Sequence, residues 1–280
     1  MSSKNKDKNK SKNKDKKKPT MAEQADRHVL YEESVQCVEA EIDFVDQTFR
    51  ELRDRTAKYL REDFCGTGNT SCEWVRRRKT NHAIGIDLDA EVVNWGRQHK
   101  IGALTPAQAK RIELRIEDVL EAETPAMDIV LAMNFSYWLF EDRPTLLKYF
   151  QRVRGALADD GIMFLDAFGG HDAPRELKER TKFKKHTYIW EQAYFNPITN
   201  HMRCHIHFKM KDGSKLEKAF SYEWRLWSLP EIRELLLEAG FSKATVYWQG
   251  EEDEDGEEEF YPTEEGDADA GWIAYIVAEK

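Results

Sequence analysis

The sequence predicts an α/β fold with a mostly parallel sheet, and two observations support this. Short apolar strands alternate with amphipathic helices over residues 58–166, a pattern typical of a parallel sheet covered by helices on both faces. Near the C-terminus, strands at 243–249 and 271–278 follow one another without an intervening helix. Such strands pair antiparallel at a sheet edge. We therefore expect a seven-stranded sheet that ends in an antiparallel hairpin.

A helical segment over 21–57 is expected to precede the sheet, because residues such as Ile42, Val45 and Phe49 recur at helical spacing. Parallel strands are predicted at 58–64, 82–87, 111–116, 127–133 and 162–166, with helices at 69–79, 89–98, around 146–153 and at 229–239. Asp89 is expected to cap the second of these helices. The alternation predicts one domain over 21–280.

An insert over 183–227 separates the fifth strand from the last helix. It contains three segments that read as long strands, at 187–195, 201–211 and 215–227. Polar turn residues such as Asp212 and Gly213 join them. The insert is therefore expected to form an antiparallel sheet of its own.

Charge is concentrated at two places in the chain. Residues 1–18 hold nine lysines and two aspartates, whereas residues 251–269 hold twelve Asp and Glu and no Lys or Arg. The lysine-rich tail over 1–20 has nothing apolar to bury and is expected to be disordered, and 250–270 is expected to be an acidic loop. The remainder is close to neutral, which argues against a dedicated nucleic-acid surface.

Hydropathy and cysteine spacing also indicate the cellular compartment. No run of 18 apolar residues exists that would span a membrane, and the N-terminus lacks the apolar stretch of a secretory signal. The four cysteines show neither disulfide-like nor zinc-like spacing. A reducing, cytoplasmic location is the expectation.

The most informative motif lies at the end of the first strand. Residues 60–68 read Leu-Arg-Glu-Asp-Phe-Cys-Gly-Thr-Gly, and the second strand ends on Asp87. Glycines let a backbone approach a ligand closely, and the following helix offers free N–H groups. An acid at the tip of the second strand is placed to bind ribose hydroxyls. These features predict a nucleoside cofactor. The third glycine of a dinucleotide motif is replaced by Ser71, which disfavours nicotinamide.

Cys65-Gly66-Thr67-Gly68 resembles motif I of the class I S-adenosylmethionine-dependent methyltransferases, a Rossmann-like family whose sheet also ends in an antiparallel hairpin. The family usually carries an acid, any residue and a glycine before this motif, whereas this chain has Glu62-Asp63-Phe64. Either Glu62 or Asp63 takes the acidic role. The resemblance implies S-adenosylmethionine as cofactor, held by Tyr31, Glu62, Asp63, Cys65, Gly66, Thr67, Gly68, Asp87, Leu88, Asp118, Val119 and Asn134.

Several of these positions have specific implied roles. Asp87 binds ribose hydroxyls in the family, with a helix N-cap as the alternative reading. Asp118 accepts from the adenine amino group and Val119 offers its backbone N–H, unless Asp118 is an ordinary loop acid. Asn134 lies at the carboxyl end of the fourth strand, where open α/β sheets place ligands. Tyr31 belongs to an N-terminal helix that folds over the cofactor.

Asn134-Phe135-Ser136-Tyr137 lacks the two prolines of the Asn-Pro-Pro-Tyr segment found in adenine and glutamine methyltransferases. It resembles the corresponding segment of small-molecule N- and O-methyltransferases, including the glycine and sarcosine enzymes, in which an antiparallel insert sits above the cofactor. Candidate catalytic residues are Tyr137, His171 and His205. The histidines at 201–207 are spread too far along one strand to share a metal ion, so no metal is expected.

The predicted function is transfer of a methyl group from S-adenosylmethionine to a nucleophilic N or O of a small molecule. The alternatives are an RNA or protein methyltransferase, a nicotinamide-dependent oxidoreductase, and a binding protein that keeps the fold without turnover. The expected partner is a small-molecule substrate. Nucleic acid is disfavoured as a partner, and the oligomeric state is left open.

Overall fold

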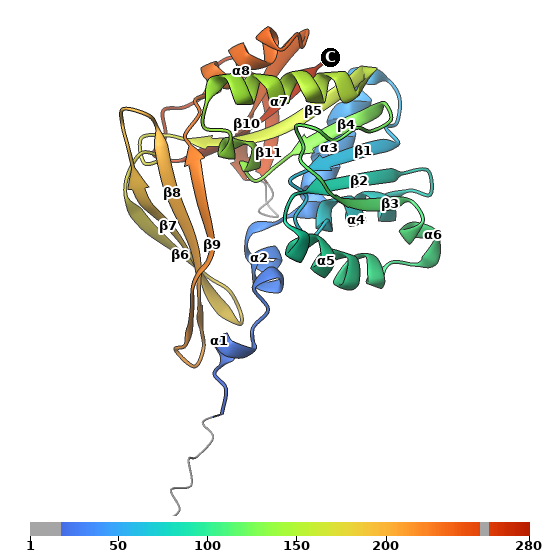
Figure 1. Cartoon of the computed structure of the whole chain (residues 1–280). Coiled ribbons are helices and arrows are strands. Elements are labelled where there is room, and N and C mark those ends of the chain that lie inside the picture. The colour runs from blue at the N-terminus through green and yellow to red at the C-terminus, as the bar shows by residue number, and fades with distance from the viewer. Residues whose placement is uncertain (1–17, 253–257) are drawn as a thin grey trace, which may run out of the picture.

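Strands with almost no exposed side chain form the centre of the molecule; in β4, all six residues of Met127–Ala132 are buried. The computed structural model describes residues 18–252 and 258–280. Its main sheet has the strand order β11-β10-β12-β5-β4-β1-β2-β3 (Figure 1). The strands are β1 (Tyr59–Asp63), β2 (His82–Asp87), β3 (Ile112–Ile116), β4 (Met127–Ala132), β5 (Leu157–Gly169), β10 (Lys243–Glu252), β11 (Glu258–Thr263) and β12 (Trp272–Glu279).

The predicted parallel core and terminal hairpin are confirmed. Strands β1 to β5 pair in parallel. Strand β12 runs antiparallel to β5, and β10 runs antiparallel to β12. Because the carboxyl ends of the five parallel strands meet at one edge of the sheet, the motif turn after β1 lies beside the tips of β2 and β4.

The expected count of seven strands is wrong, because β11 adds an eighth strand beside β10. This strand lies within 250–270, where a loop was expected. Phe260 packs between Phe44 and Tyr275, so part of the acid-rich segment carries the apolar contact that holds a strand. Residues 253–257 of that segment, and residues 1–17 of the lysine-rich tail expected over 1–20, lie outside the described residues.

Helices cover both faces of the main sheet. One face buries apolar side chains of α3 (Val38–Arg53), α4 (Asn69–Arg77) and α5 (Ala90–His99). The other face buries those of α7 (Arg143–Ala156) and α8 (Leu229–Glu238). The shorter elements are α1 (Met21–Gln24), α2 (Arg27–Val35), η1 (Ile101–Ala103), α6 (Pro106–Ala109) and η2 (Ser136–Leu139). The Asp89 carboxylate accepts from two backbone N–H groups of α5, which confirms the predicted cap.

The insert forms a separate four-stranded antiparallel sheet, the cap, which stands beside the main body (Figure 1). Its strands are β6 (Leu177–Lys182), β7 (His186–Phe195), β8 (His201–Met210) and β9 (Lys215–Arg225). The expected start at 183 misses β6, whose sequence Leu-Lys-Glu-Arg-Thr-Lys is largely exposed and has no apolar alternation. Met202, Cys204 and Trp224 on the inner face of the cap belong to the core cluster of α7 and α8, so buried apolar contacts fix the cap to the body.

Helix α2 bridges the cap and the body. On the cap side, Leu30 packs in the same apolar cluster as Ile206 and Phe208. On the body side, the Thr67 hydroxyl donates to the Glu32 carboxylate at 2.7 Å. The predicted N-terminal helix therefore lies across the motif turn while it rests on the cap. No helix among the described residues is long and apolar enough to cross a membrane.

Gly96 of α5 packs directly against the backbone of the motif turn, and a methyl group at this position would overlap the Thr67 carbonyl oxygen. We expect Gly96→Ala to lower the free energy of unfolding by about 2 kcal/mol, because the overlapped atom is backbone and cannot rotate away. Urea denaturation checks this.

Gly155→Ala in α7 is the matched control, because nothing lies within 4 Å of the added methyl group. Alanine there should stabilise the chain by up to about 1 kcal/mol through helix propensity. Equal effects of the two substitutions would contradict the close packing of α5 on the turn.

Candidate active site

Two adjoining cavities open at the carboxyl ends of β1, β2 and β4, and together we call them the cofactor cavity. The larger has a volume of about 960 Å³ and is lined by Gly66, Asp87, Leu88, Asp118 and Val119 among others. The smaller has a volume of about 110 Å³, and its lining includes Glu62, Asp63, Cys65, Thr67 and Asn134. Tyr31 lines both. The structure thus gathers eleven of the twelve predicted cofactor residues, and Gly68 lies just behind them.

The motif turn needs its two glycines for different reasons. Gly66 has a φ of +53° and a Cβ there would meet nothing within 4 Å, so its bare backbone leaves open space at the cavity wall. Gly68 has a φ of +70°, and a Cβ there would strike the Leu114 side chain. The turn is held by the Gly66 N–H, which donates to the Asp87 carboxylate at 2.8 Å.

Asp87 is not the N-cap of α5, because Asp89 occupies that position. Its second carboxylate oxygen accepts from the Asp89 N–H at 2.9 Å. Burial raises the pKa of Asp87, against these backbone hydrogen bonds, which lower it. The carboxylate is thus oriented by backbone at the edge of the cofactor cavity.

Phe64 stands where the family has its first glycine, and it adopts the left-handed φ of +56°. A non-glycine residue pays a steric cost of roughly 1 kcal/mol for this conformation. The ring packs on Phe140 and Tyr149, with centroid distances of 5.9 and 5.6 Å. The glycine-like shape of the turn is therefore kept, and the aromatic side chain adds a wall to the cavity.

Glu62 and Asp63 each have an internal partner, on opposite faces of β1. Asp63 pairs with the buried Arg61 guanidinium at 2.6 Å and accepts from the Tyr149 hydroxyl at 2.9 Å. Glu62 accepts from the Ser71 N–H at 2.8 Å at the start of α4. Burial raises the pKa of Glu62 to about 7. Both carboxylates brace the cavity floor, and their contact with a cofactor stays a prediction.

Asp118 and Val119 lie together on the far wall of the larger cavity. The Asp118 side chain is exposed and accepts from the Leu120 N–H at 2.9 Å. Val119 is buried, and its carbonyl accepts from Arg61 at 3.1 Å. Arg61 thus connects the end of β1 to the loop after β3.

Asp166, at the carboxyl end of β5, is a site residue that the sequence reasoning missed. Its two carboxylate oxygens accept from the N–H groups of Asn134 and Phe135, at 2.7 and 2.8 Å. Both of these residues have a φ of +57°. Burial raises the pKa of Asp166 to about 7. An acid that ends an apolar parallel strand is the signal that points to it.

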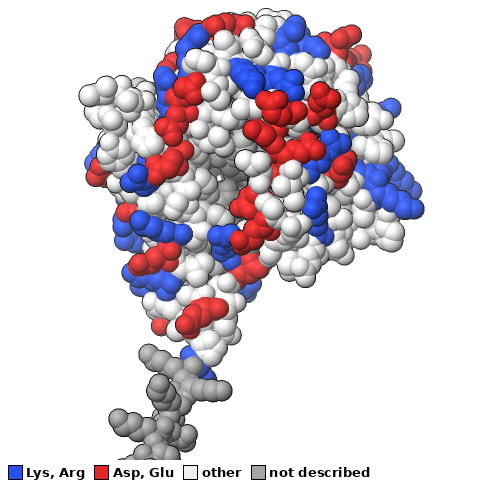
Figure 2. Space-filling model, in the orientation of Figure 1, with Lys and Arg blue, Asp and Glu red and all other residues white. Residues whose placement is uncertain are grey.

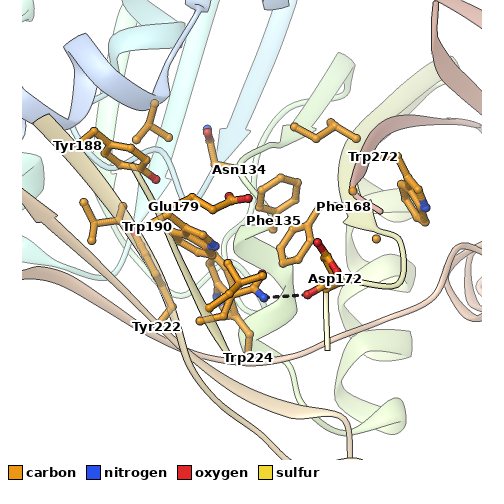
Figure 3. A pocket seen from close by; sticks show the side chains of 18 of the residues that line it. Asn134, Phe135, Phe168, Asp172, Glu179, Tyr188, Trp190, Tyr222, Trp224 and Trp272 are labelled. Carbon is orange, nitrogen blue, oxygen red and sulfur yellow. Dashed lines mark hydrogen bonds between the residues drawn. The ribbon is translucent and has the colours of Figure 1, made fainter. Parts of the chain in front are cut away.

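A third cavity, the acceptor cavity, lies between the body and the cap and has a volume of about 480 Å³. Aromatic side chains dominate its walls, as Figure 3 shows: Tyr31, Phe135, Phe168, Tyr188, Trp190, Tyr222, Trp224 and Trp272. Tyr31, Asn134, Tyr222 and Trp224 also line the cofactor cavity. The two cavities therefore meet at these four side chains.

The structure keeps the three candidate catalytic residues out of the acceptor cavity. Tyr137 is fully buried and donates to the Asp166 carbonyl at 2.8 Å, and burial raises its pKa far above the usual range. The His171 side chain is 68% exposed. The His205 ring forms a hydrogen bond with Ser221. It lies on one face of β8, whereas Ile206, on the opposite face, lines the acceptor cavity. The apolar face of β8 is the one turned inward, so none of the three is retained as a general base.

The other two histidines of β8 have acidic partners. His201 contacts Glu141 and Glu223, and His207 contacts Glu191, each at 2.8 Å. Among the described residues, no group of three or more His, Cys, Asp or Glu side chains is arranged to hold a metal ion.

Comparison with known proteins agrees with this geometry. Residues 65–163 match the model of a family described as a methyltransferase domain. The comparison with curated proteins gave no match. A similar solved structure is an S-adenosylmethionine-dependent methyltransferase from Clostridium acetobutylicum, with 14% identity, a TM-score of 0.66, and coverage of 90% of this chain and 96% of that chain.

Two further structures are similar. CalS10, an amino pentose methyltransferase from Micromonospora echinaspora, has 13% identity, a TM-score of 0.63, and coverage of 90% and 95% of the two chains. The sugar N-methyltransferase KedS8 from Streptoalloteichus has 16% identity, a TM-score of 0.62, and coverage of 91% and 93%. At these identities the likeness establishes the fold. Residues 65–163 thus match a methyltransferase-domain model, and the fold of most of the chain is that of S-adenosylmethionine-dependent methyltransferases.

The buried Glu62 carboxyl gives a pH-dependent prediction. The pKa of Glu62 is about 7 in the folded chain, against an ordinary value of 4.5. Between these two pH values the folded chain therefore keeps a proton on Glu62 that the unfolded chain releases. This stabilisation is fully present below about pH 4.5 and is lost as the pH rises to about 7. Between pH 4.5 and 7.5 we expect the wild-type free energy of unfolding to fall by roughly 3 kcal/mol more than that of Glu62→Gln.

Denaturation at a series of pH values measures this difference. Glu176→Gln, which changes an exposed carboxylate, serves as the control and should follow the wild-type curve. Parallel curves for wild type and Glu62→Gln would contradict the raised pKa of Glu62.

Proposed function

We propose that the chain binds S-adenosylmethionine in the cofactor cavity and transfers its methyl group to a nucleophilic N or O of a small molecule in the acceptor cavity. The observation that carries the proposal is the junction formed by the side chains Tyr31, Asn134, Tyr222 and Trp224, which line both the cofactor cavity on the motif turn and the aromatic cavity under the cap. A cofactor in the first cavity can thereby present a methyl group to an acceptor in the second.

The residues of the cofactor cavity fit this cofactor. The open space at Gly66 admits a ligand against the backbone, and Asp87 at the tip of β2 is placed for ribose hydroxyls. Asp118 and Val119 line the same cavity, and we assign them to the adenine ring by the resemblance to motif-bearing methyltransferases. Figure 2 shows a hollow between cap and body with acidic side chains along its rim. The acids that line the larger cavity are Asp87, Asp89, Glu117, Asp118 and Glu223, against the basic residues Arg27 and Lys218, and this acidic excess suits a cofactor of net positive charge.

Methyl transfer requires little from the protein beyond the placement of the cofactor and the acceptor. Bound S-adenosylmethionine supplies a methyl group that its sulfonium has already activated, so alignment and exclusion of water provide most of the rate. Helix α2 and the cap enclose the junction, and the Asp166 carboxylate fixes the backbone that carries Asn134. Tyr31 and Tyr222 bond to each other, and burial raises the pKa of both. They therefore act as neutral hydrogen-bonding groups rather than as bases.

The similar structures support a small-molecule acceptor, since KedS8 is a sugar N-methyltransferase and CalS10 an amino pentose methyltransferase by their descriptions. The acceptor cavity is enclosed by the cap and has a volume of about 480 Å³, a size that suits a small ligand. The cytoplasmic location stays a prediction.

Calorimetric titration with S-adenosylhomocysteine tests the cofactor assignment. We expect micromolar binding by the wild-type chain and at least a tenfold weaker affinity for Asp87→Ala, because that substitution removes the carboxylate and frees the Gly66 N–H. Asp159→Ala changes an exposed acid at the opposite end of the sheet and should bind like wild type. No binding by the folded wild-type chain would overturn the proposal, and binding of NADH instead would favour an oxidoreductase.

A further inference from the structure

We infer that the acceptor cavity selects a positively charged acceptor, an amine on an apolar body, and that the Glu179 carboxylate binds this amine. The inference rests on the proposed function and names the substrate class of the same site. Three features of the cavity support it: the acidic residues that line it, the lack of a side-chain partner for Glu179, and the aromatic walls.

The charge of the cavity has one sign. Among the described residues that line it, the ionised side chains are Asp172 and Glu179, and no Lys, Arg or His is present. Asp172 is already paired with Arg175 at 2.6 Å. The Glu179 side chain is exposed at the cavity wall and has no side-chain hydrogen bond or ion pair with any described residue. Its carboxylate is therefore free to pair with a cationic group of a ligand that lies against the aromatic walls.

Strand pairing explains why this one acid points inward. In β6, Leu177 and Glu179 line the cavity. The intervening Lys178 points the other way and pairs with Glu191 of β7 at 2.9 Å. Glu179 stands opposite Trp190 in the β6–β7 register, and Trp190 also lines the cavity. The inward carboxylate is therefore set by the same alternation that sends the basic residue outward.

The aromatic walls suit the same ligand. Tyr222 and Trp224 stack with their ring centroids 4.5 Å apart, and Trp190 lies 6.1 Å from Trp224. Phe135 meets Phe168 edge-on at 4.8 Å. These mutual contacts hold the rings in place before a ligand arrives. Aromatic faces attract cations and accommodate apolar groups. A carboxylate on the ligand would instead be repelled by the ring faces and by the Glu179 carboxylate.

An amine must lose a proton before it can accept a methyl group. In the proposed step the acceptor ammonium, held beside Glu179, gives one proton to solvent, and its nitrogen lone pair then forms the C–N bond while the methyl–sulfur bond breaks. The products are the methylated ammonium, whose charge the Glu179 carboxylate still faces, and neutral-sulfur S-adenosylhomocysteine.

Three probes that share a phenylethyl body and differ in the charge of the head group test the selection: 2-phenylethylamine, 2-phenylethanol and 3-phenylpropanoate. Their binding to the full chain, saturated with S-adenosylhomocysteine, is followed at pH 7 by tryptophan fluorescence and calorimetry. We expect the amine to bind at least tenfold more tightly than the alcohol or the carboxylate. Affinities within threefold of each other, or tightest binding of the alcohol or the carboxylate, would overturn the inference.

Variants then assign the selection to one side chain. Glu179→Gln should weaken amine binding at least fivefold and leave the S-adenosylhomocysteine affinity within twofold of wild type, whereas Glu176→Gln should change neither. Glu179→Lys should shift the preference toward the carboxylate probe, and it provides a second reading should Glu179→Gln fold poorly. An amine preference that survives in the folded Glu179 variants would refute the role of Glu179.

The two proposals can fail separately. If S-adenosylhomocysteine does not bind but the unliganded chain still prefers the amine in a Glu179-dependent way, the methyl-transfer function falls and the cation site stands. If S-adenosylhomocysteine binds and the amine preference is absent, the function stands and the amine assignment falls.

Discussion

The arrangement of the site depends on one buried carboxylate. Asp166 at the end of β5 accepts from the backbone N–H groups of Asn134 and Phe135 just after β4. These bonds hold two successive residues in a left-handed conformation that L-residues seldom adopt. As a result, Asn134 faces both the cofactor cavity and the acceptor cavity, and the Phe135 ring forms a wall of the latter. The meeting of the two cavities thus follows from the pairing of adjacent strand ends.

The rest of the site is closed by segments far apart in the sequence. Helix α2 bonds to the motif turn through Glu32 and to the cap through Ser34, whose hydroxyl lies 2.7 Å from the His186 ring. The cap in turn shares a core cluster with α7 and α8. Cofactor and acceptor cavities are therefore bounded by three parts of the chain that support one another.

Much of this could be predicted from local pattern. The parallel core and the terminal hairpin were predicted from strand alternation, because local residue pattern marks where strands end. The cofactor residues were implied by the resemblance around Gly66 and Gly68, and their contact with a cofactor stays a prediction. The two strands that the sequence analysis missed were missed for one reason. Strands β6 and β11 are rich in charge and carry little apolar alternation, so only pairing with β7 and β10 makes them strands. The sequence left open whether His205 faces the acceptor cavity, because a strand pattern separates two faces without saying which one the body covers.

The sequence by itself determined the α/β class, the nucleoside-binding turn and the resemblance to class I methyltransferases, because each depends on short-range spacing and on residue types with fixed backbone preferences. The tertiary structure alone decided which side chains face the acceptor. It turned the apolar side of β8 and the single inward acid of β6 toward one cavity, and it sent the histidines of β8 to acidic partners or to Ser221. Side-chain direction in an insert follows from how its sheet docks on the body, and docking is a long-range contact that no local pattern records.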